Sequence, residues 1–398
     1  MSLDLTRLVS QVGGMVAGLK AGAEERQKHL QFALEVVGNE AIDLDDLKKK
    51  INASKTTWLV AGLVDGLNRR YEAPSTPDEF TVMAADGSHI DVDRHRSARC
   101  YLINIGSAVL RYGAAPDAVL DSFPRLYADE KDMVISHPGG GREYLLDSNL
   151  LGTKRSIEEW RRLADLAAEL PKNSCALALL DGTLIHWGLD GYPDFVCDEL
   201  LIKGFLRCLD DMKKLNGERK LALASYISFP GSTDVANVLK VAVCPNDPPN
   251  CDTHCPPGKE RDCEKVAGMR DRDLFINLLG PGERSALFTS PSKIIEKHYG
   301  AHRVYFFYIR LDDEIARIEI PQWVAENNDL LHLTHSLVLD QCRRGQGYPV
   351  ALSEAHEQAV VTGADRENFW QLVESLLVEE RLPALCSAKS QSKRTRWV

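Results

Sequence analysis

The chain has 398 residues, of which 44% are hydrophobic and 27% charged, and its formal net charge is −10. These values are ordinary for a globular protein with a large core, and they exclude a basic coat protein for nucleic acid, but not a locally basic groove. Ten cysteines in a chain of this length do not indicate a disulfide scaffold. The N-terminus lacks the order of a signal peptide and no apolar run is long enough to cross a membrane, so we expect a cytoplasmic protein.

Residues 1–75 are predicted to form an N-terminal helical arm. Within residues 3–38, apolar side chains recur at steps of three and four, which is typical of a helix with one apolar stripe. Residues 43–70 are predicted to be helical again, and the prolines in residues 72–78 indicate a linker. We expect the arm to pack on its own domain or to contact a partner.

Two predicted strands deliver aspartates to what we expect to be one end of a sheet. The first follows the apolar run at residues 82–85 and ends at Asp86, and the second follows residues 176–180 and ends at Asp181. A glycine comes directly after each aspartate and keeps the backbone slim enough for a ligand to approach. Paired aspartates of this kind indicate a site for hard divalent cations.

A helix is predicted between these strands, over residues 150–170, and Glu159 lies beside its apolar face. The order is therefore a strand with Asp86, a further strand over residues 100–112, a helix with Glu159, and a strand with Asp181. That order predicts an α/β fold of the ribonuclease-H-like type, with a mixed sheet and flanking helices, in which a helix supplies the middle carboxylate. The segment Asp181-Gly182-Thr183 is also similar to a phosphatase nucleophile loop, but Leu179 stands where the nucleophile would be, which excludes that reaction.

The rest of the chain is predicted to alternate helices and strands. Strands are expected at residues 221–227, 303–311 and 316–320, and helices at residues 195–216, 234–243, 328–343 and 353–360, with a last helix from residue 365. The tail, residues 386–398, carries lysines and arginines but no acid, and is predicted to be a disordered basic tail.

Four cysteines cluster in a loop that is rich in Pro, Asp and Asn: Cys244, Cys251, Cys255 and Cys263, with His254 among them. Such a loop can bury little apolar surface, so Zn²⁺ held by four thiolates, or by three and His254, would organise it. The spacing is irregular and contains no tight Cys-x-x-Cys, so four free cysteines in a flexible loop are an equal alternative. An iron–sulfur cluster is a third possibility.

An ordered set of motifs resembles the NurA family, nucleases that work beside the HerA translocase in DNA end resection. The motifs run in family order from about residue 80 to residue 370, which places a nuclease domain at residues 76–385 with the cysteine loop, about residues 244–265, as an insertion. They are Ala84–Ser88, Lys154–Glu159, Leu180–Leu184, Tyr226–Ser228, Phe306–Arg310, Arg317–Pro321, Tyr348–Pro349 and Glu354–His356.

The resemblance implies a core close to that of the Piwi nucleases, a homodimer that encloses a DNA channel, and docking on a HerA-like hexameric ATPase. It also implies Mn²⁺- or Mg²⁺-dependent cleavage of DNA, as a 5′-to-3′ exonuclease and single-strand endonuclease in double-strand break repair. By motif, Asp86, Glu159 and Asp181 correspond to the metal-binding carboxylates. Tyr348 and His356 correspond to further active-site residues, and His356 is a further candidate metal ligand or proton carrier.

The chemistry agrees with this resemblance, because hydrolysis of a phosphodiester can use two cations roughly 3.5–4 Å apart, held by several carboxylates. Glu158 stays an alternative to Glu159 as the ligand from the helix. Two other functions also stay open: a non-catalytic subunit that binds DNA or a motor, and another ribonuclease-H-like nuclease, such as a junction resolvase or an RNA-guided enzyme. The intact set of carboxylates argues against the first of these.

Overall fold

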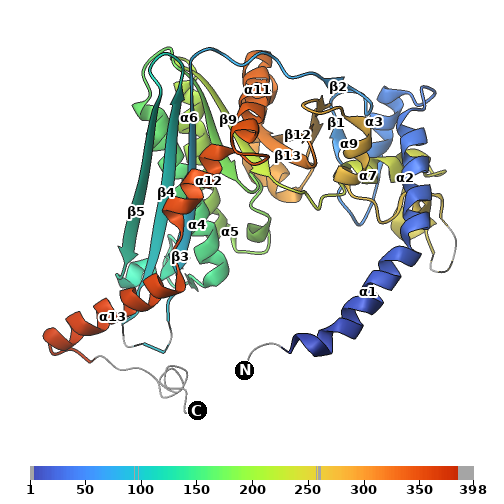
Figure 1. The fold of residues 1–398 in the computed structure, drawn as a ribbon. Helices are drawn as coiled ribbons and strands as arrows, with labels where there is room; N and C mark the ends of the chain where they lie inside the picture. The colour runs from blue at the N-terminus through green and yellow to red at the C-terminus, as the bar shows by residue number, and fades with distance from the viewer. Residues whose placement is uncertain (1–3, 94, 97, 257, 259–260, 384–398) are drawn as a thin grey trace. The chain divides into compact units, whose positions relative to one another are not determined.

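The computed structural model describes residues 4–93, 95–96, 98–256, 258 and 261–383 (Figure 1). Its contacts divide the chain into two compact units. The first contains the chain up to Ala73, Ile227–Ser292 and Tyr305–Ile318, and the second contains Pro74–Tyr226, Lys293–Val304 and the chain from Glu319 onward. Two later segments thus group with the N-terminal residues. The predicted basic tail, residues 386–398, lies outside the described residues.

In the first unit, helices pack around one apolar core that contains Leu47, Phe275 and Phe306. Short antiparallel strands complete it: β1 pairs with β11, β2 with β10, and both β10 and β11 with β12. Its elements are η1 (Leu5–Leu8), α1 (Val9–Ala21), α2 (Ala23–Val37), α3 (Leu44–Ala53), β1 (Gly62–Leu63), β2 (Arg70–Tyr71), α7 (Asp234–Val243), α8 (Cys251–His254), η5 (Asp262–Val266), α9 (Asp271–Leu278), β10 (Arg284–Ser285), β11 (Phe288–Thr289) and most of β12 (Val304–Arg310) and β13 (Ile315–Pro321).

The predicted N-terminal arm is helical only in part. Helices α1 and α2 cover most of residues 3–38, as expected, but the helix predicted over residues 43–70 ends at Ala53, and β1 and β2 occupy part of the remainder. The prediction is wrong beyond Ala53 because Ser54 leaves the helical conformation there, and because Gly62 and Leu63 pair with β11. Helix α1 has no buried residue, so its apolar stripe faces solvent in this unit: Val9, Val12, Met15, Val16 and Leu19 are all at least half exposed.

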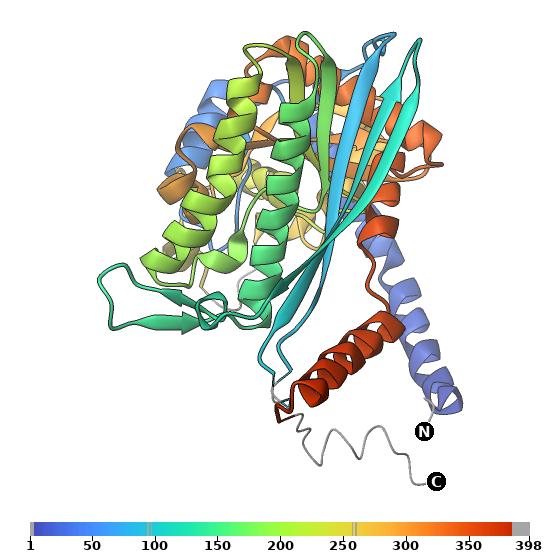
Figure 2. The ribbon, with the colours of Figure 1, turned by 90° about the vertical axis from the view of Figure 1, so that its left-hand side faces the viewer.

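The second unit is built on a five-stranded part of the sheet, in the order β9-β8-β3-β4-β5. Strands β3, β4 and β5 are mutually antiparallel, and β8 and β9 run parallel to β3. The chain therefore forms three antiparallel strands, crosses over through a helix, and adds two parallel strands on the other side of the first. This is the strand order of the ribonuclease-H-like fold, so the predicted fold class is confirmed. Figures 1 and 2 show the long strands β3–β5 side by side.

Helices α4 and α12 cover the sheet near β3. Helix α4 begins at the N-cap Asp147, whose side chain accepts a hydrogen bond from the Leu150 N–H, and its apolar face packs on the sheet. Figure 2 shows α4 and α6 on one side of the long strands and α12 on the other. The elements are β3 (Phe80–Ile90), β4 (Tyr101–Tyr112), β5 (Asp117–Tyr127), η2 (Glu130–Asp132), β6 (Val134–Ser136), β7 (Glu143–Leu145), α4 (Ser148–Glu169), β8 (Cys175–Asp181), η3 (Trp187–Leu189), α5 (Asp194–Cys197), η4 (Asp198–Leu206), α6 (Arg207–Leu215), β9 (Lys220–Ile227), η6 (Ile295–Tyr299), η7 (Gly300–His302), α10 (Gln322–Ala325), α11 (Asn328–Arg344), α12 (Val350–Ala359) and α13 (Gly363–Glu379).

Among the helices that the structure describes, none combines the length and the apolar composition that a bilayer-spanning segment needs.

Candidate active site

The register of β3 and β8 brings Asp86 and Asp181 together. The two strands pair in parallel from Thr81 opposite Ala176 to Ala85 opposite Leu180, so the next residues along are the two aspartates. Asp181 is the last residue of β8, as predicted. Asp86 is not at a strand end, which corrects the prediction, because β3 continues to pair with β4 as far as Ile90.

Gly87 makes room for the carboxylate that α4 supplies. A Cβ atom at this position would lie 2.6 Å from Glu159 Oε1 and 2.9 Å from Arg155 Cγ, both too close for real atoms. Only glycine therefore allows the Glu159 side chain to come this near to β3. The glycine after Asp86 has the function that the sequence indicated for it, but the group that approaches is a side chain of this chain.

Glu159 is buried among negative charges. Burial is the largest cause that raises the pKa of this carboxyl, to about 8, and Asp86 and Asp181 add to it, while Arg155 acts in the opposite direction. The Arg155 Nε atom lies 3.1 Å from Glu159 Oε1, yet this ion pair leaves Oε1 without a properly oriented hydrogen-bond donor. A buried carboxylate oxygen without a donor is the kind of group that a cation would satisfy.

Asp181 is held by neighbours from two segments. Its carboxylate accepts a hydrogen bond from the Tyr348 hydroxyl, which lowers its pKa, and the nearby Gly182 N–H lowers it as well while it donates to the Tyr226 carbonyl at 2.9 Å. The net shift is nevertheless upward, because the protein around this partly exposed group desolvates it and because Asp86 lies close. The Tyr348 ring packs edge-on against Tyr226, at 5.5 Å between ring centroids, which fixes the position of its hydroxyl.

His356 reaches Asp86 from α12. Its Nδ1 atom lies 2.6 Å from Asp86 Oδ2, and 63% of the side chain is exposed. The end of α12 is attached to the sheet, since Ser88 Oγ and Asn104 Nδ2 both donate to the Ala359 carbonyl, at 2.5 and 3.0 Å. The histidine is therefore placed by the helix backbone and is open to solvent on its other side.

Glu158, the alternative to Glu159, lies elsewhere. Its Oε1 atom pairs with Arg161 Nη1 at 2.6 Å. Its charge acts on Tyr101, Tyr127 and Lys154, and it is not among the groups that shift the pKa of Asp181. The structure thus brings together all five residues predicted for the site, with Glu159 and not Glu158 beside the two aspartates. Their roles as ligands or catalytic groups stay predictions.

Glu319 is a residue at this site to which the sequence gave no function. It is 1% exposed, and its Oε2 atom accepts hydrogen bonds from Thr183 Oγ1, at 2.7 Å, and from the Leu184 N–H, at 2.8 Å. These bonds hold the turn that follows Asp181, where Gly182 has a φ of +100°. A carboxylate in an apolar strand, in the segment Arg317–Pro321, was the available signal, but nothing in the sequence connects it with Thr183.

Replacement of Glu319 by alanine is expected to lower cleavage about thirtyfold, because losing the acceptor for two hydrogen bonds costs about 2 kcal/mol and frees the turn that carries Asp181. Glu319→Gln keeps an oxygen that accepts both bonds and should retain most of the turnover. Steady-state kinetics on a labelled DNA substrate would measure the difference, which should be in kcat more than in KM. Equal activity of the two variants would contradict a positioning role.

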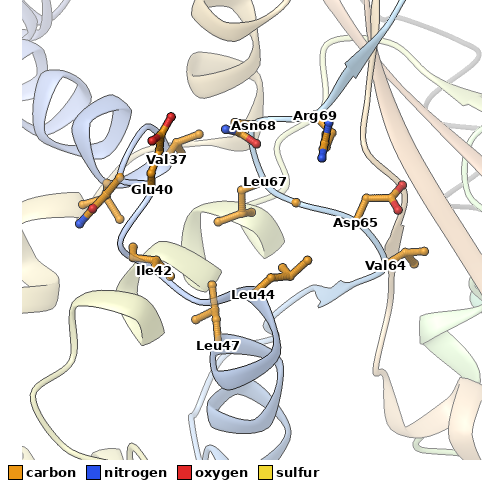
Figure 3. Close-up of a pocket in the computed structure, with 13 residues that line it drawn as sticks. Val37, Glu40, Ile42, Leu44, Leu47, Val64, Asp65, Leu67, Asn68 and Arg69 are labelled. Atoms are coloured by element: carbon orange, nitrogen blue, oxygen red, sulfur yellow. The ribbon is translucent and has the colours of Figure 1, made fainter.

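Two other regions do not belong to this site. A surface pocket of the first unit, lined by residues such as Glu40, Leu44, Asp65 and Arg69, holds no cluster of carboxylates (Figure 3). Cys244, Cys251, Cys255 and Cys263 also belong to the first unit. Within the described residues, no group of three or more His, Cys, Asp or Glu side chains could hold a metal ion as these side chains stand, and this applies to the carboxylates of the candidate site as well as to the cysteines.

The arrangement suits chemistry on a phosphate ester. Three carboxylates converge and Arg155 pairs with one of them, a histidine lies at the edge, and a tyrosine hydroxyl orients another carboxylate. Oxygen-rich sites of this type suit Mg²⁺ and Mn²⁺ and do not suit soft metals.

One comparison with known proteins supports this assignment. Residues 80–361 match the NurA domain, and this range covers well over half of the chain and every residue of the site. A comparison with curated proteins finds no match. Among solved structures the chain is similar to a crystal structure of LC9-RNase H1, described as a type 1 RNase H with the type 2 active-site motif. The identity is 10%, the similarity covers 42% of this chain and 71% of that chain, and the TM-score is 0.21. With so low a TM-score, the fold assignment depends on the strand order described above. From the match over residues 80–361, the chain belongs to the NurA family of nucleases.

Proposed function

We propose that this protein is a divalent-cation-dependent deoxyribonuclease that acts in DNA end resection, as a 5′-to-3′ exonuclease and a single-strand endonuclease. The observation that supports it most is the convergence of Asp86, Glu159 and Asp181 at the end of β8. Family membership supports the nuclease reaction. The choice of DNA, of the direction of cleavage and of the repair pathway comes from the resemblance in sequence.

Asp86, Glu159 and Asp181 would hold the cations, with His356 as a further ligand, and Mn²⁺ is the ion that we expect, with Mg²⁺ as the alternative. Such cations lower the pKa of water and neutralise charge on the phosphate. Burial first, and then the charges of Asp86 and Asp181, raise the pKa of Glu159, and a bound cation would offset both effects. A donor-deficient oxygen on Glu159 fits this role.

The remaining residues act on protons and on orientation. With Nδ1 of His356 directed at Asp86, its Nε2 atom faces the solvent side, where it would either complete the cation's shell or, as the alternative, transfer a proton. The Tyr348 hydroxyl donates to Asp181 and fixes the direction of that carboxylate. Neither residue needs to form a covalent bond with the substrate.

We further propose that the protein works as a homodimer docked on a HerA-like hexameric ATPase. The resemblance in sequence is the main reason. The exposed apolar residues of α1, which the first unit leaves uncovered, are the candidate contact surface. Light scattering that shows only monomer at micromolar concentration would contradict the dimer.

Purified protein incubated with 5′-labelled linear single- and double-stranded DNA is expected to release labelled products in Mn²⁺. Excess chelator should stop cleavage, and added Mn²⁺ should restore it. RNA of the same sequence should be cut more slowly, and circular single-stranded DNA should be linearised by the endonuclease.

Asp86→Ala is the control for a contaminating nuclease, and it should be inactive on every substrate. DNA binding by the wild-type protein without any cleavage, over a range of cations, would instead indicate a non-catalytic subunit. A strong preference for branched or RNA-paired DNA over plain ends would indicate another type of ribonuclease-H-like enzyme.

A further inference from the structure

The cysteine loop of the first unit surrounds a small cavity. All four thiols of Cys244, Cys251, Cys255 and Cys263 line it, together with His254, Trp58 and Lys240. They come from different local elements: Cys244 directly follows α7, Cys251 begins α8, Cys255 follows it, and Cys263 lies in η5. Each of the four is half-buried. The folding of the loop thus gathers cysteines that the sequence spaces irregularly.

The thiols are close enough to interact. The side chains of Cys251 and Cys255 form a hydrogen bond, and Cys244 and Cys263 act on Cys251 electrostatically. Cys263 is likewise influenced by Cys255 and Cys244. Of the six possible pairs among the four cysteines, every pair except Cys244 with Cys255 thus interacts, so the four form one group and not separate surface thiols.

The surroundings suit a group of thiolates. Asn246 Nδ2 points at Cys244 Sγ, at 3.9 Å, as a weak N–H···S donor. The half-buried Lys240 interacts with Cys251 and Cys263, and its ammonium lies 5.1 Å from the centroid of the Trp58 ring. Lys50 Nζ donates to the Cys244 carbonyl at 2.6 Å. A cation bound by four thiolates has a net negative charge, and the ammonium groups of Lys240 and Lys50 would offset it.

The loop has little else to hold it. Between Cys244 and Cys263, Pro249 is the only buried residue in the part that the structure describes. Apart from the bond from Lys50 to Cys244, its described backbone is attached at Lys55, where Lys55 N donates to the Pro249 carbonyl, at 2.8 Å, and Cys251 N donates to the Lys55 carbonyl, at 3.0 Å. A segment with so little apolar burial gains its order from another source when it is ordered.

We propose that Cys244, Cys251, Cys255 and Cys263 bind one Zn²⁺ ion, and that the ion is structural. Four protein ligands close a tetrahedral shell and leave no position for a reacting water. The thiols do not yet surround a common point, so binding draws them inward by movement of the loop. The ion would not exchange with the hydrolytic cations, because thiolates select softer metals than carboxylates do.

The full chain, purified without a histidine tag and without chelator, is expected to contain one zinc per chain by elemental analysis. Cys251→Ser should lower the zinc content about tenfold or more, whereas Cys175→Ser, a half-buried cysteine at the start of β8, should not change it. His254→Ala should also retain zinc. Co²⁺ in place of zinc should give the thiolate charge-transfer and visible bands of a tetrahedral site, and these bands should be lost in Cys251→Ser.

Four outcomes would overturn the proposal: no stoichiometric zinc with four freely titrating thiols, stoichiometric iron with visible absorption, a Cys251–Cys255 disulfide in the purified protein, or loss of zinc in His254→Ala. The zinc proposal does not depend on the nuclease function, and the variant Cys251→Ser tests the two independently. Cys251→Ser should lose zinc and become more sensitive to proteolysis in the loop, yet keep Mn²⁺-dependent cleavage. Loss of all cleavage with the fold retained would show that the ion is not merely structural.

Discussion

Asp181→Asn is expected to lower DNA cleavage about a thousandfold or more, equivalent to about 4 kcal/mol of lost transition-state stabilisation, while the protein stays folded. An amide has the shape of the carboxylate but not its charge, so it weakens the hold on a cation at the end of β8. The fold should survive because the Asn side-chain oxygen can still accept the hydrogen bond from the Tyr348 hydroxyl, and because the Gly182 N–H donates to the Tyr226 carbonyl in either protein. Turnover on labelled single-stranded DNA, with circular dichroism as the fold check, measures both quantities.

Glu158→Gln is the matched control for this experiment. It removes a carboxylate from the same site-forming region of α4, but one that pairs with Arg161 at 2.6 Å and not with the aspartates. Its activity should stay within about threefold of the wild type, because the Glu158 side chain pairs with Arg161, away from the reacting groups, and the amide can still accept the hydrogen bond from Arg161 Nη1. Near-wild-type turnover of Asp181→Asn, or an equal loss in Glu158→Gln, would show that the carboxylates have been assigned wrongly.

The parts of the site that could be predicted from sequence are those set by local patterns. A run of five apolar residues before Asp181 indicates a buried strand, and the strand ends where the polar residues begin. The apolar stripe of α4 likewise determines its length, and it places Glu159 on the face turned toward the sheet. These two elements contain the information for their own positions, which explains why Asp181 and the helix could be placed in advance, whereas the preference for Glu159 over Glu158 came from the resemblance to the family.

Asp86 shows what local patterns do not contain. The polar residues after it suggest a strand end, but β3 continues to Ile90 because β4 is long enough to pair with it. Strand β5 was missed for a related reason. It is an edge strand whose residues are exposed from Asp117 to Leu126, so it lacks the alternation of buried and exposed positions that predicts a strand. In both cases the partner strand decides the structure, and a single segment does not reveal its partner.

Contacts across long sequence separations were the least predictable. Glu319 binds Thr183, which lies 136 residues earlier, and His356 binds Asp86, which lies 270 residues earlier. Of these, the resemblance to a family supplied His356 and gave no role to Glu319. The helix predicted over residues 43–70 failed because its apolar residues after Ala53 serve strand pairing and the core of the first unit, which periodicity alone does not distinguish from a helix face.

Gly106→Ala is expected to destabilise the protein by about 3 kcal/mol and to lower cleavage as well. Gly106 pairs with Asp86 across β3 and β4, and α12 lies directly on it. A Cβ atom there would lie 2.6 Å from the Gln358 carbonyl carbon and would also collide with the Ala355 oxygen and the Ala359 nitrogen. These are backbone atoms, so no rotation of a side chain relieves the overlap, and the whole helix has to move away from the sheet.

That movement has a specific consequence for the site. The bonds from Ser88 and Asn104 to the Ala359 carbonyl would be stretched, and the 2.6 Å contact of His356 with Asp86 would be lost with them. Urea unfolding measures the loss of stability, and turnover at a temperature where the variant is fully folded measures the effect on the site. Gly152→Ala is the matched control: it adds the same methyl group to an interior position of α4 where nothing lies within 4 Å, so it should stabilise the protein by about 0.5–1 kcal/mol. If Gly106→Ala instead unfolded at the wild-type urea concentration, the close approach of α12 to β4 would be wrong, and with it the placement of His356 beside Asp86.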